Sequence, residues 1–245
     1  MLHKHSRLIA APVAAAALIL TAAGYQANAA EAQALGRSGK PAATAVPCLA
    51  DATTLVGDLD GDRRPDKIVN PGHTGTRMTV QWGTATGTFG AKHAVSELLG
   101  AKRGEIASAA VADFQKDGTL DMVVNIVKPA GGDDPATARL AEYRPGPLKR
   151  SNLKSAHPRH SDIGELGEAK QLRIANYGGD AYPDLAILNN SGDGGLDRDV
   201  RLTKPGSGPG SYVYEQQVKY GEFATTGEPP SMPTDGWKQF YKPCS

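Results

Sequence analysis

This chain of 245 residues has only two cysteines, few aromatic residues and no large excess of either charge. Its 27 basic residues are balanced by 26 acidic ones, which makes nucleic acid a poor candidate partner. After residue 29 no apolar run approaches the roughly 20 residues needed to span a membrane, so membrane insertion is not expected. Aromatic residues make up only 6% of the chain, which weakens a role in stacking on polysaccharides.

The first 29 residues have the pattern of a secretory signal peptide. A short basic start, Lys4 to Arg7, precedes an apolar run from Leu8 to Gly24 that Pro12 interrupts. Ala27-Asn28-Ala29 is a small-x-small cleavage signal. The alternative, a membrane anchor, would need a longer apolar run. We therefore expect a secreted, extracellular protein.

The chain has two cysteines, Cys48 and Cys244. In an oxidising compartment an even pair indicates a disulfide. The alternative, a metal site, would lack further thiols or clustered histidines to complete it. The disulfide predicts that both ends of the domain meet.

The most informative feature that is present is one short acidic loop. Asp58, Asp60, Asp62 and Asp66 occupy its positions 1, 3, 5 and 9. Carboxylates so close together repel one another unless a cation lies among them. Oxygen ligands without Cys or His favour a hard ion, so Ca²⁺ is the predicted cofactor. Gly61 permits the sharp turn that points the oxygens inward.

The loop differs from the helix-flanked EF-hand, which requires a bidentate Glu at position 12. Position 12 of this loop is Val69. Short β-branched runs flank the loop, Thr54 to Val56 before it and Lys67 to Val69 after it, and such runs indicate strands. We expect the loop to join two strands and to close its ion site with Asp66.

The same spacing returns twice with fewer carboxylates. Loop starts at 58, 113 and 176 are 55 and 63 residues apart, which is the period of a repeat architecture. At position 7 we expect backbone carbonyl ligands. The third loop has Gly178 at position 3, which offers no side-chain ligand. The full set of predicted metal ligands is Asp58, Asp60, Asp62, Arg64 and Asp66, then Asp113, Gln115, Asp117, Thr119 and Asp121, then Asn176, Asp180, Tyr182 and Asp184.

At these residues the chain resembles the FG-GAP (VCBS-type) repeat family, the calcium-loop repeat of integrin α-subunit propellers and of many secreted bacterial proteins. The resemblance is carried by Asp58–Asp66 with the strand that follows, and by Gly87–Gly90, which looks like the Gly/Phe turn that ends such repeats. It covers roughly residues 53–222. It implies blades of four antiparallel strands and calcium held by loop carboxylates. It does not imply one function, because the family serves adhesion, ligand binding and accessory roles.

The predicted fold class is all-β, a β-propeller-like array of about three, or four, four-stranded antiparallel blades. A flexible arm (30–47) precedes the domain (48–245), whose repeats span about 53–101, 105–156 and 169–222 before a C-terminal tail (223–245). Closed propellers normally have 4–8 blades. The tail and residues 46–53 could complete a fourth blade, three sheets could close a small ring, or several chains could share one.

The strands are predicted from their apolar patterns. Apart from the strands around the first loop, they are residues 78–82 and 94–98 in the first repeat, 106–111, 122–124 and 139–143 in the second, and 172–174, 185–188, 200–202 and 212–214 in the third. The glycine-rich string 205–210 lies between two of these strands, so it indicates a hairpin and not a phosphate-binding loop. The aromatic residues of the tail are expected to pack on the first repeat.

No catalytic constellation is evident. There is no Gly-x-Ser-x-Gly string, and the cysteines are expected to be paired. His157 and His160 are separated by a proline that opposes a helix presenting both to one metal, so a solvated loop is favoured. A cluster of basic residues around them indicates a solvated face or, alternatively, an anion-binding surface. It consists of Lys149, Arg150, Lys154, His157, Arg159 and His160.

Two functions remain open. The first is a secreted calcium-binding module without catalytic activity, which binds an extracellular protein or glycan. The second is a secreted hydrolase or lyase whose site is spread over the loops of a propeller. The absence of catalytic motifs and the small size favour the first.

Overall fold

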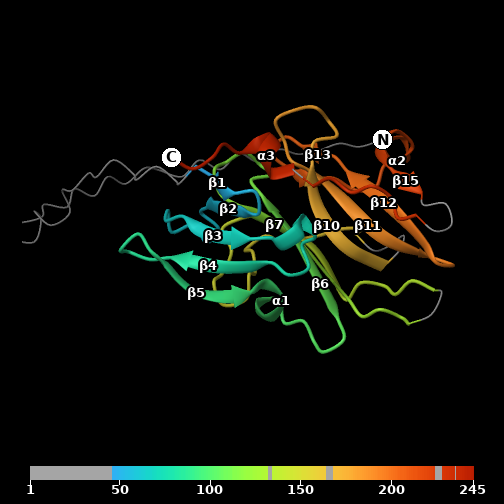
Figure 1. Ribbon diagram of the computed structural model, residues 1–245, viewed down its shortest axis with the longest axis horizontal. Helices are drawn as coiled ribbons and strands as arrows, with labels where there is room; N and C mark the ends of the chain where they lie inside the picture. The colour runs from blue at the N-terminus through green and yellow to red at the C-terminus, as the bar shows by residue number, and fades with distance from the viewer. Residues whose placement is uncertain (1–45, 132–133, 164–167, 224–227, 235) are drawn as a thin grey trace, which may run out of the picture. The chain divides into compact units, whose positions relative to one another are not determined.

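A computed structural model of the protein describes residues 46–131, 134–163, 168–223, 228–234 and 236–245. They form an all-β arrangement of four antiparallel sheets with three short α-helices (Figure 1). The predicted signal peptide and most of the arm lie outside the described residues. Within the described part, no helix has both the length and the apolar character needed to cross a membrane.

The first repeat forms a five-stranded sheet in which each strand pairs with the next. Its strands are β1 (Cys48–Asp51), β2 (Thr54–Gly57), β3 (Asp66–Val69), β4 (Thr79–Gly83) and β5 (Phe89–Ala94), and a 3-10 turn, η1 (Pro71–His73), follows β3. The first loop joins β2 to β3, as predicted. Met78, Val80 and Trp82 alternate along one face and are all buried, so this face of the strand belongs to the core.

The end of the first repeat differs from the prediction. Residues 94–98 were expected to form the fourth strand, but helix α1 (Val95–Leu98) begins there and the fourth strand of the repeat is β5. Val95 and Leu99 are both buried and lie four residues apart, which is the spacing of one helix face. The Gly/Phe turn prediction is also corrected, because Gly87 ends a turn that leads into β5 and does not close the repeat.

The second and third repeats each form a four-stranded antiparallel sheet. The second contains β6 (Ile106–Ala112), β7 (Asp121–Val127), β8 (Leu140–Arg144) and β9 (Arg159–His160). The third contains β10 (Glu168–Ala175), β11 (Asp184–Gly192), β12 (Gly195–Arg201) and β15 (Glu222–Phe223). The predicted inner strands are confirmed. The string 205–210 is the turn of a two-stranded hairpin, β13 (Thr203–Lys204) and β14 (Gly208–Pro209), also as predicted.

The predicted outer strand at residues 212–214 is wrong. Tyr214 begins helix α2 (Tyr214–Tyr220), which lies against β12. The buried side chain of Gln217 donates to the carbonyl of Val200 (2.7 Å) and accepts from its N–H (2.9 Å). One amide side chain thus satisfies the backbone groups that a neighbouring strand would have paired, so a helix can cover this edge.

The sheets meet through backbone hydrogen bonds from one repeat to the next. The N–H groups of Leu120 and Leu148, in the second repeat, donate to the carbonyls of Asp58 and Leu59 in the first loop, each at 2.8 Å. Ala109 donates to Gly75 at 3.0 Å. Strand β6 lies beside β10, as Figure 1 shows. The apolar core is continuous across these junctions.

The tail returns to the first sheet. Cys48 and Cys244 form a disulfide, as predicted. Leu49 donates to Lys242 and accepts from Cys244, both at 2.8 Å, so the tail lies along β1 and extends the first sheet. Among the described residues it therefore builds no separate fourth blade, and the four sheets close into neither a barrel nor a propeller.

The aromatic residues of the tail bridge two repeats. Helix α3 (Gly236–Phe240) places the Trp237 ring edge-on to His73 of the first repeat, with 6.4 Å between the centroids. The Trp237 indole donates to the Val111 carbonyl in the second repeat (2.8 Å), and the Tyr241 hydroxyl accepts from Asp113 N–H (2.7 Å). The expected packing on the first repeat is thus only part of what the tail does.

Replacing both cysteines by serine (C48S/C244S) should lower the free energy of unfolding by as much as roughly 5 kcal/mol, because the bond closes a very long loop in the unfolded chain. Urea unfolding with and without reductant measures this, and reduction of the native protein should reproduce the effect of the double variant. Equal midpoints for the native and double-variant proteins, or two reactive thiols in the denatured, unreduced protein, would contradict the prediction.

Candidate metal centre

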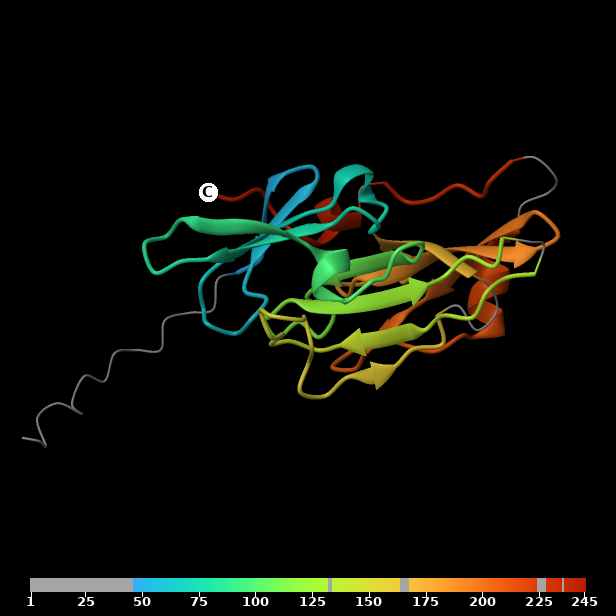
Figure 2. The same cartoon turned by 90° about the horizontal axis from the view of Figure 1, so that it is seen from below.

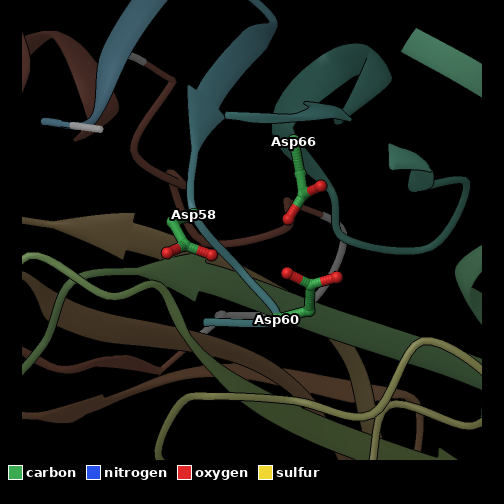
Figure 3. A group of neighbouring side chains, drawn as sticks. All are labelled: Asp58, Asp60 and Asp66. Atoms are coloured by element: carbon green, nitrogen blue, oxygen red, sulfur yellow. The ribbon is translucent and has the colours of Figure 1, made fainter. Parts of the chain in front are cut away.

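Three carboxylates of the first loop converge on one point. The side chains of Asp58, Asp60 and Asp66 each present an oxygen, and these oxygens all lie within 4.8 Å of one another. Figure 3 shows the three carboxylates turned toward a common space. Two oxygens that bind one Ca²⁺ at its usual distance can be at most about 4.6–5.2 Å apart. The donor set and its spacing therefore fit a calcium ion.

Asp58 and Asp66 are buried and held by backbone donors. Asp66 accepts from the N–H groups of Leu59 (2.9 Å) and Gly83 (2.8 Å), and Asp58 accepts from Gly61 (2.7 Å) and Arg63 (2.9 Å). Burial nevertheless raises the pKa of Asp66 to about 6 and also raises that of Asp58, because desolvation outweighs the hydrogen bonds. Without a cation, the ionised forms of Asp58 and Asp66 are therefore unfavourable.

Gly61 confirms the turn expected from the sequence. Its φ is +79°, a conformation that glycine adopts without steric cost. A Cβ at this position would also lie 2.6 Å from the Cβ of Pro147 in the second repeat. The loop is therefore shaped both by its own turn and by the neighbouring repeat.

Arg150 supplies a cation to this loop from the second repeat. Its guanidinium donates to Asp60 and, at 2.6 Å, to Asp62, and it lies over the ring of Trp82 with 5.6 Å to the centroid. Asp62, at position 5, also pairs with Arg64 (3.2 Å) and does not belong to the converging group. Arg150 belongs to the basic cluster predicted as a solvated face, but its role here is to neutralise an acidic loop.

The second loop keeps its geometry but gathers fewer ligands. Asp121 is fully buried and accepts from Phe114 N–H (3.0 Å), Gly146 N–H (2.8 Å) and the Tyr143 hydroxyl (2.9 Å). Burial raises its pKa to about 7. Asp113 accepts from two N–H groups of its own loop and also has a raised pKa through burial.

The position-3 residue of the second loop points away from a shared centre. The side-chain amide of Gln115 donates to the carbonyl of Gly206 in the β13–β14 hairpin, at 3.0 Å. Asp117, at position 5, is exposed. Among the described residues the three carboxylates of this loop do not converge as those of the first loop do.

The third loop has two carboxylates and an asparagine. Asp184 is buried and accepts from Tyr177, Gly178 and Thr203, each at 2.8 Å, while Asp180 is exposed. The Oδ1 atom of Asn176, at position 1, is buried, and no described group donates to it. An unpaired buried oxygen at a predicted ligand position fits a cation-binding role.

Two hydrogen-bond patterns recur in all three loops. The position-5 aspartate accepts at 2.8 Å from the position-7 N–H, which belongs to Arg64, Thr119 or Tyr182. The position-9 aspartate accepts from the N–H of position 2 and from an N–H just beyond or at the end of the third strand of its sheet. These position-9 pairs are Asp66 with Leu59 and Gly83, Asp121 with Phe114 and Gly146, and Asp184 with Tyr177 and Thr203.

The structural role of these residues was missed by sequence reasoning, which assigned position 9 to the metal alone. A signal for it exists in the glycines at the end of, or just beyond, two of the third strands. A Cβ on Gly83 would lie 2.5 Å from the Pro65 carbonyl, and one on Gly146 would lie 2.7 Å from the Leu120 carbonyl. Only glycine lets the backbone approach the residue before each position-9 aspartate so closely.

In a chelator, the free energy of unfolding should fall as pH rises from about 4 to 7. Asp66 and Asp121 hold their protons with pKa values of about 6 and about 7 in the folded protein, against about 3.9 when unfolded, so stability is complete below pH 4 and lost as they ionise. Urea unfolding in EDTA across this range tests the sign. Asp121→Asn should flatten the curve, most clearly between pH 6 and 7, whereas the exposed Asp134→Asn should not. Stability that rises with pH would contradict the prediction.

Comparison with known protein families agrees with the geometry. The FG-GAP-like repeat family matches residues 58–124, which include the first two loops and strands β3 to β6. Searches of curated proteins and of solved structures return no match to this chain. The third loop lies outside the matched residues and is related to the others by the hydrogen-bond patterns above. The chain thus carries an FG-GAP-like repeat.

Proposed function

We propose that this protein is a secreted, calcium-stabilised binding module without catalytic activity, whose loops present a surface to an extracellular protein or glycan. The observation that carries the calcium assignment is the convergence of Asp58, Asp60 and Asp66. Three carboxylates with neither nitrogen nor sulfur ligands suit a hard divalent cation. The FG-GAP-like repeat over these residues supports the same ion.

Calcium would act here chiefly on stability. The burial that raises the pKa values of Asp58 and Asp66 measures how unfavourable their charges are without a cation. A bound Ca²⁺ would reverse this, since it favours the ionised form. Binding to the folded state alone would add about 2.7 kcal/mol at a hundredfold excess over the dissociation constant.

The three loops would differ in affinity. The first gathers three carboxylates, while the second turns Gln115 toward the hairpin and the third offers Asn176 in place of an aspartate. Affinity for calcium rises with the number of charged ligands. The order first, second, third follows, with backbone carbonyls at Arg64, Thr119 and Tyr182 as further ligands.

Secretion and binding complete the proposal. The disulfide between Cys48 and Cys244 suits an oxidising compartment, and residues 1–29 carry the sequence pattern of a signal peptide. The three larger sheets would be the blades of a propeller-like array, whose rigid β scaffold positions loops for recognition. The alternative, a secreted hydrolase or lyase, would need a catalytic group outside the three loops and would reveal itself as turnover of glycoside, ester or peptide substrates.

Asp60→Asn should abolish calcium binding by the first loop and remove most of the difference in melting temperature between calcium and EDTA. The change removes one of the three converging charges while keeping the size of the side chain. Isothermal titration calorimetry gives the number of ions bound, and thermal unfolding gives the stabilisation.

Glu97→Gln is the matched control, because it removes one carboxylate from the same repeat at an exposed position in α1. It should leave both measurements unchanged. No calcium uptake by the native protein, or melting curves that coincide with and without chelator, would overturn the calcium assignment.

Arg150→Gln should have opposite effects in the two conditions. In EDTA it should lower the melting temperature, because Asp60 and Asp62 lose the cation that neutralises them. In calorimetry it should tighten calcium binding by roughly fivefold, since a partly exposed ion pair that calcium must displace contributes about 1 kcal/mol. Arg150→Lys, which keeps the charge, should show smaller effects of both signs. Weaker calcium binding in Arg150→Gln would contradict this competition.

A further inference from the structure

A polar cleft lies between the second sheet and the β13–β14 hairpin, away from the first loop. Its volume is about 250 Å³. One wall is strand β9 with the two residues after it, the other is the β13–β14 hairpin, and the ring of Tyr143 also lines it. Figure 2 shows β9 in gold at the edge of the second sheet. Its polar side chains are those of Tyr143, Arg159, His160, Ser161, Asp162, Lys204, Ser207 and Ser211.

The charge of the cleft is positive. Arg159 and Lys204 stand on opposite walls and are both exposed. The one carboxylate among the lining residues, Asp162, is already neutralised, because one oxygen accepts from the buried guanidinium of Arg201 (2.8 Å) and the other from Tyr212 N–H (2.5 Å). The two lining cations therefore face the cleft without an opposing free carboxylate among the lining residues.

Arg159 is held in place for binding. Its guanidinium lies 4.6 Å from the centroid of the Tyr143 ring and donates to the carbonyl of Ser207 across the cleft. Tyr143 is itself fixed by its hydroxyl, which donates to Asp121 at 2.9 Å. A guanidinium has five N–H donors in a rigid fork, so one bond to Ser207 leaves others for a ligand.

The opposite wall is also held in place by hydrogen bonds. As with Tyr143, its partners are residues of the acidic loops. Thr203, at the base of the hairpin, donates to Asp184 of the third loop (2.8 Å), and Gln115 of the second loop donates to Gly206 at its tip (3.0 Å). A Cβ on Gly208 would lie 2.4 Å from the Tyr143 ring, so glycine allows the hairpin to pack directly on that ring. The backbone of the hairpin therefore has little freedom to lose when a ligand binds.

We propose that this cleft binds an oxyanion, the carboxylate or phosphate of a hydroxylated extracellular polymer, which names the ligand class of the binding function proposed above. Arg159 and Lys204 receive the anionic group from two sides. The hydroxyls of Ser161, Ser207 and Ser211 can hydrogen-bond the alcohol groups beside it. A carboxylate and a phosphate share the planar edge of two oxygens that a guanidinium recognises.

Titration calorimetry with galacturonate, glycerol 3-phosphate and inorganic phosphate, at constant ionic strength and in calcium, tests the proposal on the full chain. We expect saturable binding of one ligand per chain by at least one organic probe. Arg159→Gln and Lys204→Gln should each weaken it at least about tenfold, because each removes a charge-assisted hydrogen bond. Tighter binding of galacturonate would identify a uronate as the anionic group of the ligand, and tighter binding of glycerol 3-phosphate would identify a phosphate.

Lys149→Gln is the matched control, since it removes an exposed charge of the same basic cluster outside the cleft. It should keep the native affinity, and melting curves should show that all variants fold. The proposal that the cleft binds an oxyanion would be overturned if no probe bound saturably, or if Lys149→Gln weakened binding as much as the cleft variants do. Calcium uptake without anion binding refutes the cleft alone, whereas anion binding without calcium uptake refutes the calcium assignment and leaves the cleft standing.

Discussion

The aspartate at position 9 of each loop is the constraint on which the rest of this structure depends. Each of these carboxylates is buried, and each joins the start of its own loop to the backbone at the end of the third strand. It thereby fixes the loop to three strands of one sheet. A buried carboxylate is costly unless its oxygens are paired, and here backbone N–H groups pair them, with the Tyr143 hydroxyl as a further donor to Asp121.

The clamped loops are also the places where repeats meet. In the first loop, the carbonyls of Asp58 and Leu59 accept from the second repeat, and Arg150 of that repeat pairs with Asp60. The second loop in turn supports Tyr143, which lines the cleft beside β9. The acidic loops and the junctions between sheets are therefore one system, in which a charge change in a loop acts on the packing between sheets.

Local sequence patterns predicted the inner strands and failed at the outer ones. β2, β3, β6, β7, β10 and β11 flank the loops and carry buried aliphatic runs, whose pattern is the same whatever packs against them. At the sheet edges the apolar pattern is short, and the packing against neighbouring elements decides whether a strand or a helix forms. Residues 95–98 became a helix because Val95 and Leu99 share one buried face, and α2 replaced a strand because Gln217 satisfies the β12 backbone.

The sequence by itself determined the loops, the repeat period and the pairing of Cys48 with Cys244, because carboxylate spacing, turn glycines and an even cysteine count are local or compositional facts. Only the tertiary structure decided which predicted ligands converge: Arg150 pairs with both Asp60 and Asp62, yet only Asp60 joins Asp58 and Asp66. Gln115 is turned toward Gly206, a partner distant in sequence. The tertiary structure also decided that the tail joins the first sheet and that Arg159 and Lys204 share a cleft. Such contacts depend on how sheets pack against one another, and no spacing along the chain records that.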